Sequence, residues 1–295
     1  MPSLLFEPSD YQFASSLDDV LDTLAREGDK ARIIAGGTTI HELAYRKGMG
    51  DVRTLVDVTR LPMGRITESE GRVSVGATVT FTELAAYARA RHPKALAIVT
   101  DAIAGIRPMQ IRNVGTVGGA VCSSLPFFDL PAALVALDAK VTVNSRSKGE
   151  RSIPIEEFFW DFFLPDLRPD ELLTAVDFAV PRAGTAGAFQ KFESNSVDWA
   201  LVSIGVQVTV VGGRFLSSRV ALGGGIGRKV TRASTVENAL DGCAVTDEHA
   251  IDRAAAGVVD DVRAFSDFRG SAKFRNHLLK TYIARCLHQA ARRTQ

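Results

Sequence analysis

The 295-residue chain carries 35 Lys and Arg against 34 Asp and Glu, so its net charge is +1 at pH 7. A charge this close to zero gives no reason to expect a nucleic acid or an anionic membrane surface as a partner. The hydrophobic fraction of 46% is ordinary for a globular protein, and the length suffices for two domains. No apolar run reaches the ~18 residues of a membrane span, and the N-terminus lacks the pattern of a signal peptide.

Cysteine and histidine usage predicts no metal site in this chain. Cys122, Cys243 and Cys286 lie far apart and form no CxxC pair, and the five histidines are dispersed. The odd cysteine number also argues against a disulfide framework, which fits a reducing cytoplasm. HExxH and GxSxG are both missing, so we expect no catalytic acid, base or nucleophile of the usual kinds.

The first part of the chain alternates between helical and extended patterns. Apolar periodicity and breaking residues predict helices over 11–30, 41–47, 83–91 and 94–106. They also predict strands over 31–34, 54–58 and 72–77. We expect Ser15 or Ser16 to cap the first helix and Thr82 to cap the third. His92-Pro93 separates the last two helices, because proline cannot continue a helix.

Residues 108–124 are rich in Gly, Thr and Ser, which predicts irregular structure, and the pattern then returns to a helix over 129–137 and a strand over 140–145. Phe158, Phe159, Trp160, Phe162 and Phe163 form an aromatic cluster, which favours a core or a subunit interface over a cofactor stack. A turn-rich boundary follows at 181–184. Beyond it we expect strands over 201–211 and 215–222 and helices over 234–241, 247–260 and 271–289.

Two glycine-rich segments are candidates for binding a phosphate group. They are Ile33-Ile34-Ala35-Gly36-Gly37-Thr38-Thr39-Ile40 and Asn113-Val114-Gly115-Thr116-Val117-Gly118-Gly119-Ala120. Glycine has no Cβ, so its backbone N–H can approach a phosphate closely, and threonine hydroxyls can add hydrogen bonds. Neither segment matches a P-loop or a GxGxxG fingerprint. A third run, Gly223–Gly227, is interpreted as a turn. Together the first two segments indicate a bipartite cradle for a diphosphate.

At these segments the sequence resembles the FAD-binding medium subunits of molybdenum hydroxylases, the xanthine dehydrogenase and carbon monoxide dehydrogenase flavoprotein family. An AGGT-type loop follows the first strand of that family, and a second block reads I-R-N-x-G-T-x-G-G-N before a Pro and an Asp. Here Ile111–Ala120 matches that block, followed by Pro126 and Asp129. Ala120 stands where the family usually has Asn, and Thr39 stands where acidic residues or serine are common.

The resemblance implies an α+β fold. It consists of a two-part FAD-binding domain of the vanillyl-alcohol oxidase (PCMH-like) type at 1–178, divided near 58, and a smaller α+β C-terminal domain of the CO dehydrogenase flavoprotein type at 183–290. It also implies contacts with FAD from both glycine loops and from Asp129, with Ile106, Leu173 and Lys191 near the flavin ring. From the residues alone, Asp129 is equally a helix N-cap, Leu173 a buried strand residue and Lys191 a solvated cation.

In function, the resemblance implies an oxidoreductase subunit that carries FAD. Molybdopterin would reside in a large partner subunit and two [2Fe-2S] clusters in a small one, in a heterotrimer or its dimer. Electrons would pass from the clusters to FAD and on to an external acceptor. Two alternatives stay open at this point: a stand-alone FAD oxidase or dehydrogenase of the vanillyl-alcohol oxidase type, and a flavin-free assembly protein.

Overall fold

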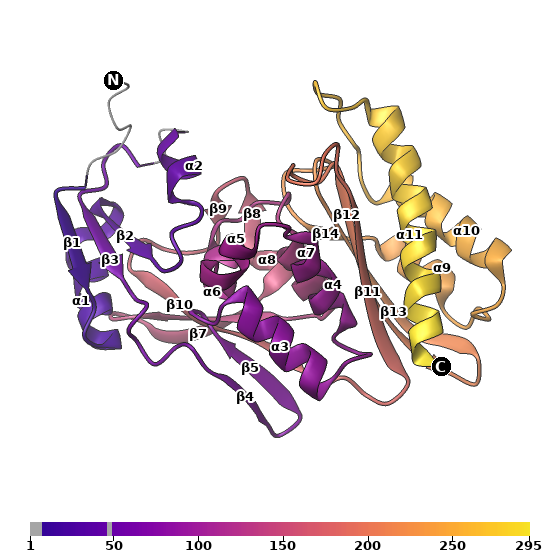
Figure 1. Cartoon of the computed structure of the whole chain (residues 1–295), viewed down its shortest axis with the longest axis horizontal. Helices are drawn as coiled ribbons and strands as arrows, with labels where there is room; N and C mark the ends of the chain where they lie inside the picture. Colours follow the sequence, from indigo (N-terminus) through magenta and orange to yellow (C-terminus); the bar gives the residue numbers. More distant parts are fainter. Residues whose placement is uncertain (1–7, 46–48) are drawn as a thin grey trace.

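The computed structural model describes residues 8–45 and 49–295. Figure 1 shows a small N-terminal sheet at one end, a central region of strands and short helices, and a C-terminal sheet covered by a long helix at the other end. The part of the predicted second helix that falls on residues 46–47 lies outside the described residues.

The N-terminal sheet is parallel, with the strand order β1-β3-β2. Its strands are β1 (Asp10–Phe13), β2 (Ala31–Ile34) and β3 (Thr54–Asp57), and α1 (Leu17–Glu27) and α2 (Ile40–Tyr45) connect them. The predicted helix over 11–30 is therefore wrong at both ends. Residues 10–13 pair with β3, a contact that local periodicity cannot reveal, and Gly28–Lys30 form a 3-10 turn. Ser16 caps α1, as predicted, by accepting from the Asp19 amide.

A five-stranded antiparallel sheet forms the centre of the molecule, in the order β4-β5-β10-β6-β7. Two of its strands, β5 (Arg72–Gly76) and β6 (Lys140–Ser145), were predicted. The sequence interpretation missed the other three: β4 (Ile66–Ser69), β7 (Gly149–Pro154) and β10 (Glu171–Ala179). The short α8 (Ile155–Phe158) and the two-stranded β8 (Phe159–Asp161) and β9 (Leu164–Pro165) follow β7.

Helices between β5 and β6 cover this sheet. They are α3 (Phe81–Arg91), α4 (Ala97–Gly105), α5 (Met109–Val114), α6 (Val117–Cys122) and α7 (Asp129–Ala136). Thr80 rather than Thr82 caps α3, in a reciprocal capping box with Glu83. The expectation of irregular structure over 108–124 is wrong, because α5 and α6 occupy most of it. Thr116 starts α6 by accepting from the Gly119 amide.

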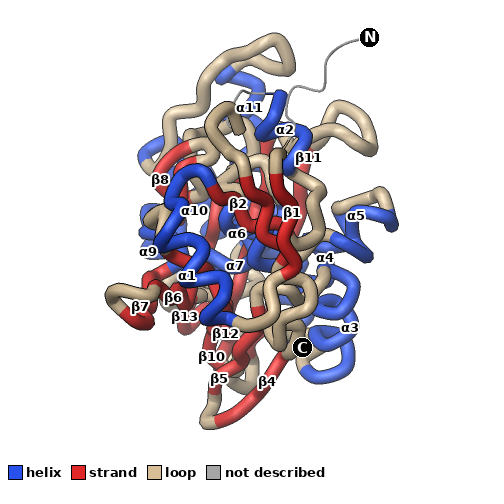
Figure 2. The backbone as a smooth tube through the Cα atoms, turned by 90° about the vertical axis from the view of Figure 1, so that its left-hand side faces the viewer, coloured by secondary structure: helices blue, strands red, loops and turns tan. Residues whose placement is uncertain are grey.

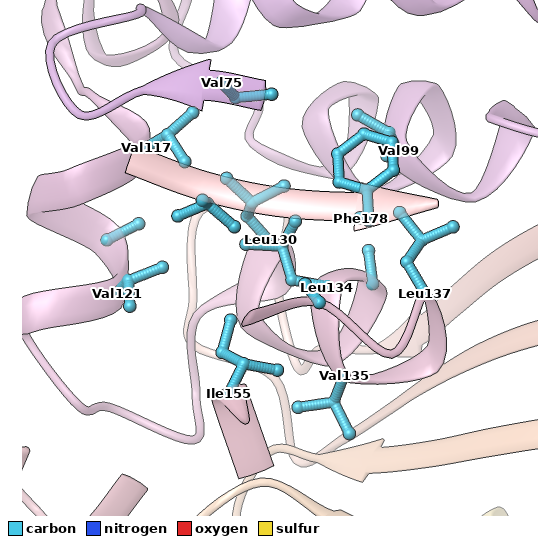
Figure 3. Packing of buried hydrophobic residues seen from close by; sticks show 14 of the residues in the cluster. Val75, Val99, Val117, Val121, Leu130, Leu134, Val135, Leu137, Ile155 and Phe178 are labelled. Carbon is cyan, nitrogen blue, oxygen red and sulfur yellow. The ribbon is translucent and has the colours of Figure 1, made fainter. Parts of the chain in front are cut away.

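The largest hydrophobic core lies around α7, which is buried along its entire length. Figure 3 shows Leu130 and Leu134 of α7 facing Val117 and Val121 of α6, with Phe178 of β10 close by. A helix that is apolar on all sides is stable only when it is enclosed on all sides. The position of α7 therefore fixes its first residue, Asp129, in the interior.

The C-terminal domain is an antiparallel sheet in the order β11-β12-β13-β14. Its strands are β11 (Thr185–Phe192), β12 (Val202–Val211), β13 (Arg214–Gly223) and β14 (Thr231–Arg232). The predicted helices are present as α9 (Ser234–Leu240), α10 (Glu248–Ala256) with a 3-10 turn at Gly257–Asp260, and α11 (Ala272–Thr294), which is longer than expected. Together, α11 and the sheet enclose a second core.

The two ends of α11 are held by buried or half-buried arginines. Near its start, Arg275 is fully buried, donates to the Gly225 carbonyl and to Asp267, and lies over the Phe265 ring at 4.7 Å. Burial raises the pKa of Asp267, but hydrogen bonds from Arg275 and Arg269 outweigh it and hold that pKa at about 2. At the other end, Arg293 pairs with Asp101 of α4 at 2.6 Å.

Among the described residues, no helix has both the length and the apolar character needed to cross a membrane. Figure 2 looks onto the N-terminal sheet and shows β1 and β2 toward the viewer, with α3 and α5 along one side. None of the residues of α5 is buried, and its Met109, Ile111 and Val114 are exposed.

We expect Arg275→Gln to lower the free energy of unfolding by about 1.5–3 kcal/mol, because a charged hydrogen bond to a buried carbonyl and an ion pair are lost together. Denaturant unfolding of the full chain measures this. Lys280→Gln is the matched control, since Lys280 is an exposed cation on the same helix. Equal stability of the two variants would contradict a structural role for the buried guanidinium.

Candidate functional site: a cavity between the two sheets

A cavity of about 1060 Å³ opens between the N-terminal sheet, the central helices and the first strand of the C-terminal domain. Every residue proposed from the sequence lines it: Ile33, Ile34, Ala35, Gly36, Gly37, Thr38, Thr39, Ile40, Ile106, Thr116, Gly118, Gly119, Ala120, Asp129, Leu173 and Lys191. These positions come from both domains and are scattered over most of the chain. The fold thus brings all of these proposed positions to the surface of one cavity.

The first glycine segment offers free hydrogen-bond donors to this cavity. It joins β2 to α2. Gly37 adopts a φ of +68°, a backbone conformation that residues with a Cβ atom rarely adopt. Within the described ranges, the amides of Gly36, Gly37, Thr38 and Thr39 have no hydrogen-bond acceptor. Successive unpaired amides at a cavity wall form an anion-binding site. The amides of this loop are therefore available for an anion, and a contact with a diphosphate stays a prediction.

The second glycine segment behaves differently, because the amides of residues 117–120 are already occupied. The Val117 amide donates to Val79 O, Gly118 to Ala77 O, Gly119 to Thr116 Oγ1 and Ala120 to Thr116 O. The expectation that both segments present free amides is thus not met by the second one. A Cβ on Gly118 would lie 2.8 Å from Ala77, so this glycine allows α6 to pack against the turn after β5.

The two segments touch each other directly. A Cβ on Gly36 would lie 1.8 Å from the Val114 carbonyl oxygen and 3.1 Å from Gly115 Cα. Ser123 Oγ also approaches Thr39 Oγ1 at 3.4 Å. The glycine at position 36 is required because backbone from α5 occupies the space of a side chain. The second segment therefore supports the shape of the first.

A buried ion pair crosses the cavity wall between the two domains. Lys191 Nζ of β11 lies 2.8 Å from Asp129 Oδ2, and only 12% of the lysine side chain and 5% of the aspartate side chain are exposed. Burial raises the pKa of Asp129 to about 6, although the Lys191 ammonium acts to lower it. Burial lowers the pKa of Lys191, but its carboxylate neighbours outweigh this and keep the pKa above its ordinary value.

These contacts decide two alternatives left open by the sequence. Phe128, not Asp129, is the N-cap position of α7, and no side chain caps that helix. The interpretation of Asp129 as an N-cap is therefore wrong, and so is that of Lys191 as a solvated cation. Leu173 is a buried residue of β10, which agrees with its interpretation as a buried strand residue. It also lines the cavity, beside a register shift in that strand.

Aromatic side chains form another part of the wall. The Phe127 ring stacks on Phe162 at 5.6 Å and on Trp199 at 5.3 Å, and the Arg269 guanidinium lies 4.9 Å from its centroid. Phe162 and Phe163 line the cavity, whereas Phe158 and Phe159 belong to the core. The aromatic cluster thus divides: Phe158 and Phe159 are core residues, as predicted, whereas Phe162 and Phe163 lie at the cavity and outside the core.

Glycines of the third run hold this aromatic wall in place. The Gly224 amide donates to Pro126 O, next to Phe127, and the Gly225 amide donates to Leu201 O, close to Trp199. Gly224 has a φ of +85°, and a Cβ there would lie 2.7 Å from Val202 Cα. The run is a turn, as predicted, and Arg275 fixes it from behind through the Gly225 carbonyl.

Sequence reasoning missed three residues around the ion pair. Glu193 lies 2.8 Å from Lys191 Nζ, Arg107 lies 3.2 Å from Glu193, and a Cβ on Gly105 would lie 3.1 Å from Asp129 Oδ2. Lys191 and Glu193 are two positions apart at the end of a strand, and residues at that spacing share a face. The spacing of Lys191 and Glu193 could have indicated from the sequence that they lie together, whereas no local pattern links Gly105 or Arg107 to either residue.

Free amides and aromatic rings around one cavity suit a cofactor that has a diphosphate and a planar ring, which places the protein among cofactor-binding redox proteins. Residues 6–182 match the FAD binding domain in molybdopterin dehydrogenase, and residues 187–290 match the CO dehydrogenase flavoprotein C-terminal domain. The chain belongs to this family of FAD-binding medium subunits of molybdenum hydroxylases, which are oxidoreductase subunits.

Similar proteins extend over nearly the whole chain. The 6-hydroxypseudooxynicotine dehydrogenase complex subunit alpha of Paenarthrobacter nicotinovorans is 32% identical, covering 97% of this chain and 95% of that one. The carbon monoxide dehydrogenase medium chain of Afipia carboxidovorans is 27% identical, covering 97% and 98%. A solved structure of carbon monoxide dehydrogenase from Hydrogenophaga pseudoflava superposes with a TM-score of 0.89 at 26% identity, covering 97% and 98%. These findings confirm the family and the expected fold, an FAD-binding domain followed by a smaller one.

We expect Gly36→Ala to force the two glycine segments apart, because the new methyl group would overlap the Val114 carbonyl. Overpacking of this kind costs about 1–3 kcal/mol of unfolding free energy, or more where backbone must move. Denaturation and bound-flavin content of the purified variant measure the effect. Gly64→Ala is the control, since its Cβ would meet only Thr78 Oγ1, at 3.5 Å. A Gly36→Ala protein with unchanged stability and flavin content would disprove the contact.

Proposed function

We propose that this chain binds FAD in the cavity between its sheets and transfers electrons in a molybdopterin-dependent hydroxylase or dehydrogenase complex. Electrons enter from the [2Fe-2S] clusters of a small partner subunit and leave from FAD to an external acceptor. The observation that carries this proposal is the convergence of the sixteen positions proposed as cofactor contacts on one cavity. We further propose domain limits of 1–178, with subdomains meeting near residue 58, and 183–290.

The residues present fit an FAD molecule in this cavity. The unpaired amides of Gly36–Thr39 suit the diphosphate, and Asp129 Oδ1, which has no hydrogen-bond partner in the described part of the chain, suits a hydroxyl donor. A buried carboxylate oxygen without a partner is costly, so an acceptor role for it supports a bound donor. Ile106 and Leu173 offer apolar surface, and Lys191 a cation, for the ring.

The second glycine segment would act mainly by shape. Thr116, Gly118, Gly119 and Ala120 line the cavity, but the amides of Gly118, Gly119 and Ala120 are satisfied, so the contribution of these three residues is close backbone approach. Ala120 is buried and has no polar group, so the contact made by the usual asparagine is not made by this side chain.

When bound, the isoalloxazine of FAD can exchange single electrons with clusters and pairs of electrons with an acceptor. This chain's own residues hold the cofactor, exclude water with the aromatic wall, and place Lys191 where a cation favours negative charge. No substrate-oxidising group is required here, because that chemistry resides in the partner that carries molybdopterin.

The relatives' names support the partner proposal. One relative is a subunit of a dehydrogenase complex, and others are the medium subunit of nicotine 6-hydroxylase and the medium chain of carbon monoxide dehydrogenase. We propose a heterotrimer with a large molybdopterin subunit and a small [2Fe-2S] subunit, or a dimer of that heterotrimer. Three free cysteines support a reducing, cytoplasmic location.

The decisive measurement is an absorption spectrum of the chain purified with its natural partners, followed by acid release of the cofactor. We expect flavin bands at about one FAD per chain, because the cavity offers one diphosphate-binding loop. Iron–sulfur absorbance should co-purify from the small subunit. A colourless chain without partners would overturn the proposed function.

A second test follows the titration of Asp129. Its pKa of about 6 in the free protein should fall when hydroxyls of FAD donate to the carboxylate, since such bonds favour the charged form. Binding should therefore release protons near pH 6, and the dissociation constant for FAD should rise below pH 6 by up to about tenfold per pH unit. Asp129→Asn should remove this pH dependence, and Asp138→Asn, which alters an exposed aspartate, should retain it. A wild-type affinity independent of pH would contradict the contact.

A further inference from the structure

Lys191 is held between two carboxylates and not by Asp129 alone. Its Nζ lies 2.8 Å from Asp129 Oδ2 and 2.8 Å from Glu193 Oε2, and the Glu193 side chain is only 11% exposed. Lys191 and Asp129 line the cavity, whereas Glu193 does not. The glutamate therefore acts on the cavity through the charged groups that it binds.

The far side of Glu193 is connected to the surface. Arg107 NH2 lies 3.2 Å from Glu193 Oε1, and the arginine side chain is 58% exposed. Asp129, Lys191, Glu193 and Arg107 thus form a chain of alternating charge, and Arg107 at its exposed end also lines the cavity. An exposed ion pair contributes little by itself, so the two buried carboxylates and the ammonium dominate the electrostatics of this network.

Gly105 leaves room for the network at its most crowded point. A Cβ at this position would lie 3.1 Å from Asp129 Oδ2 and 3.3 Å from Lys191 Cε. The end of α4 therefore packs directly on the ion pair. Such enclosure excludes water, which strengthens each charge interaction and holds the lysine in one position.

Lys191 is not a free cation, because the carboxylates of Asp129 and Glu193 lie beside its ammonium group. With both carboxylates ionised, the group of Asp129, Lys191 and Glu193 carries a net charge of one negative unit, and Arg107 offsets it only from the exposed end. The positive charge that Lys191 presents to the cavity is therefore set by how much of it Glu193 neutralises. Glu193 thus influences the charge at the cavity through Lys191, although Glu193 itself does not line the cavity.

We propose that Glu193 is a positioning residue of the cofactor site, which fixes Lys191 against Asp129 and sets the net charge that both residues present to the flavin. This inference rests on the proposed binding of FAD in the cavity. It adds a residue that matches no part of the glycine segments and that acts through Lys191.

Removing the charge of Glu193 has a defined direction. Reduced flavin carries more negative charge than oxidised flavin, so a less negative surrounding favours the reduced form. In Glu193→Gln, Lys191 is less neutralised and should stabilise that form. Glu193 also raises the pKa of Asp129, whereas Lys191 and Arg107 lower it, and these three are the charged groups acting on that carboxyl. The pKa of Asp129 should therefore fall in the variant.

The first measurement is the two-electron midpoint potential of bound FAD in the assembled complex. For Glu193→Gln we expect on the order of a tenfold gain in the affinity for reduced over oxidised flavin, which a two-electron couple reports as a rise of about 30 mV. Glu193→Asp keeps the charge and should stay near the wild-type potential. Glu150→Gln removes an exposed carboxylate elsewhere and is the matched control. A Glu193→Gln potential equal to that of the control would overturn the proposal.

The second measurement uses the chain freed of cofactor and titrated with FAD across pH. The pH at which FAD affinity begins to fall should move to lower values in Glu193→Gln and remain in place in Glu150→Gln. An unmoved midpoint in both variants would reject Glu193 as the residue that controls Asp129. If the wild-type chain binds no FAD at all, the proposed function fails first, so the two failures are distinguishable.

Discussion

The close backbone contact between the loop after β2 and the end of α5 is the constraint on which the cavity depends. At Gly36 the space of a side chain is filled by the Val114 carbonyl oxygen. This contact joins the N-terminal parallel sheet to the helices of the central sheet, and Leu172 of β10 extends the N-terminal core into the central sheet as well. Because the contact is made by backbone on both sides, it leaves little freedom in how the free amides of residues 36–39 are directed.

The buried pair of Asp129 and Lys191 makes the corresponding connection to the C-terminal domain. Desolvating two charges is expensive, and a buried ion pair often contributes less stability than apolar residues of the same volume would. Here the pair joins α7 of one domain to β11 of the other and leaves one carboxylate oxygen without a partner. A pair that is both costly and incompletely satisfied at a cavity wall is better explained by a ligand than by folding.

The sequence predicted elements with a regular apolar pattern and missed several strands, two of them in local hairpins and one that depends on distant pairing. The apolar stripe of α1 and the break at His92-Pro93 are encoded within a few residues. In contrast, β10 lies between β5 and β6, which come from separate earlier parts of the chain, and only this pairing makes it a strand. The short helix α6 was missed because its glycines lower helix propensity. It forms because Thr116 caps it and Gly118 packs on Ala77.

The candidate site could likewise be predicted only in part, because composition indicated its segments but not their arrangement. Glycine pairs beside threonines indicated where a phosphate group can be held, and the structure places both segments in one wall. Their composition could not show that one segment keeps its amides free while most amides of the other are occupied, because this depends on Ala77, Val79 and Thr116 as acceptors. Nor could it show that Lys191 is shared between two carboxylates. Residues that act on a ligand by contact can be found from a matched pattern, whereas a residue such as Glu193, which acts through the charge of its neighbour, requires the three-dimensional arrangement.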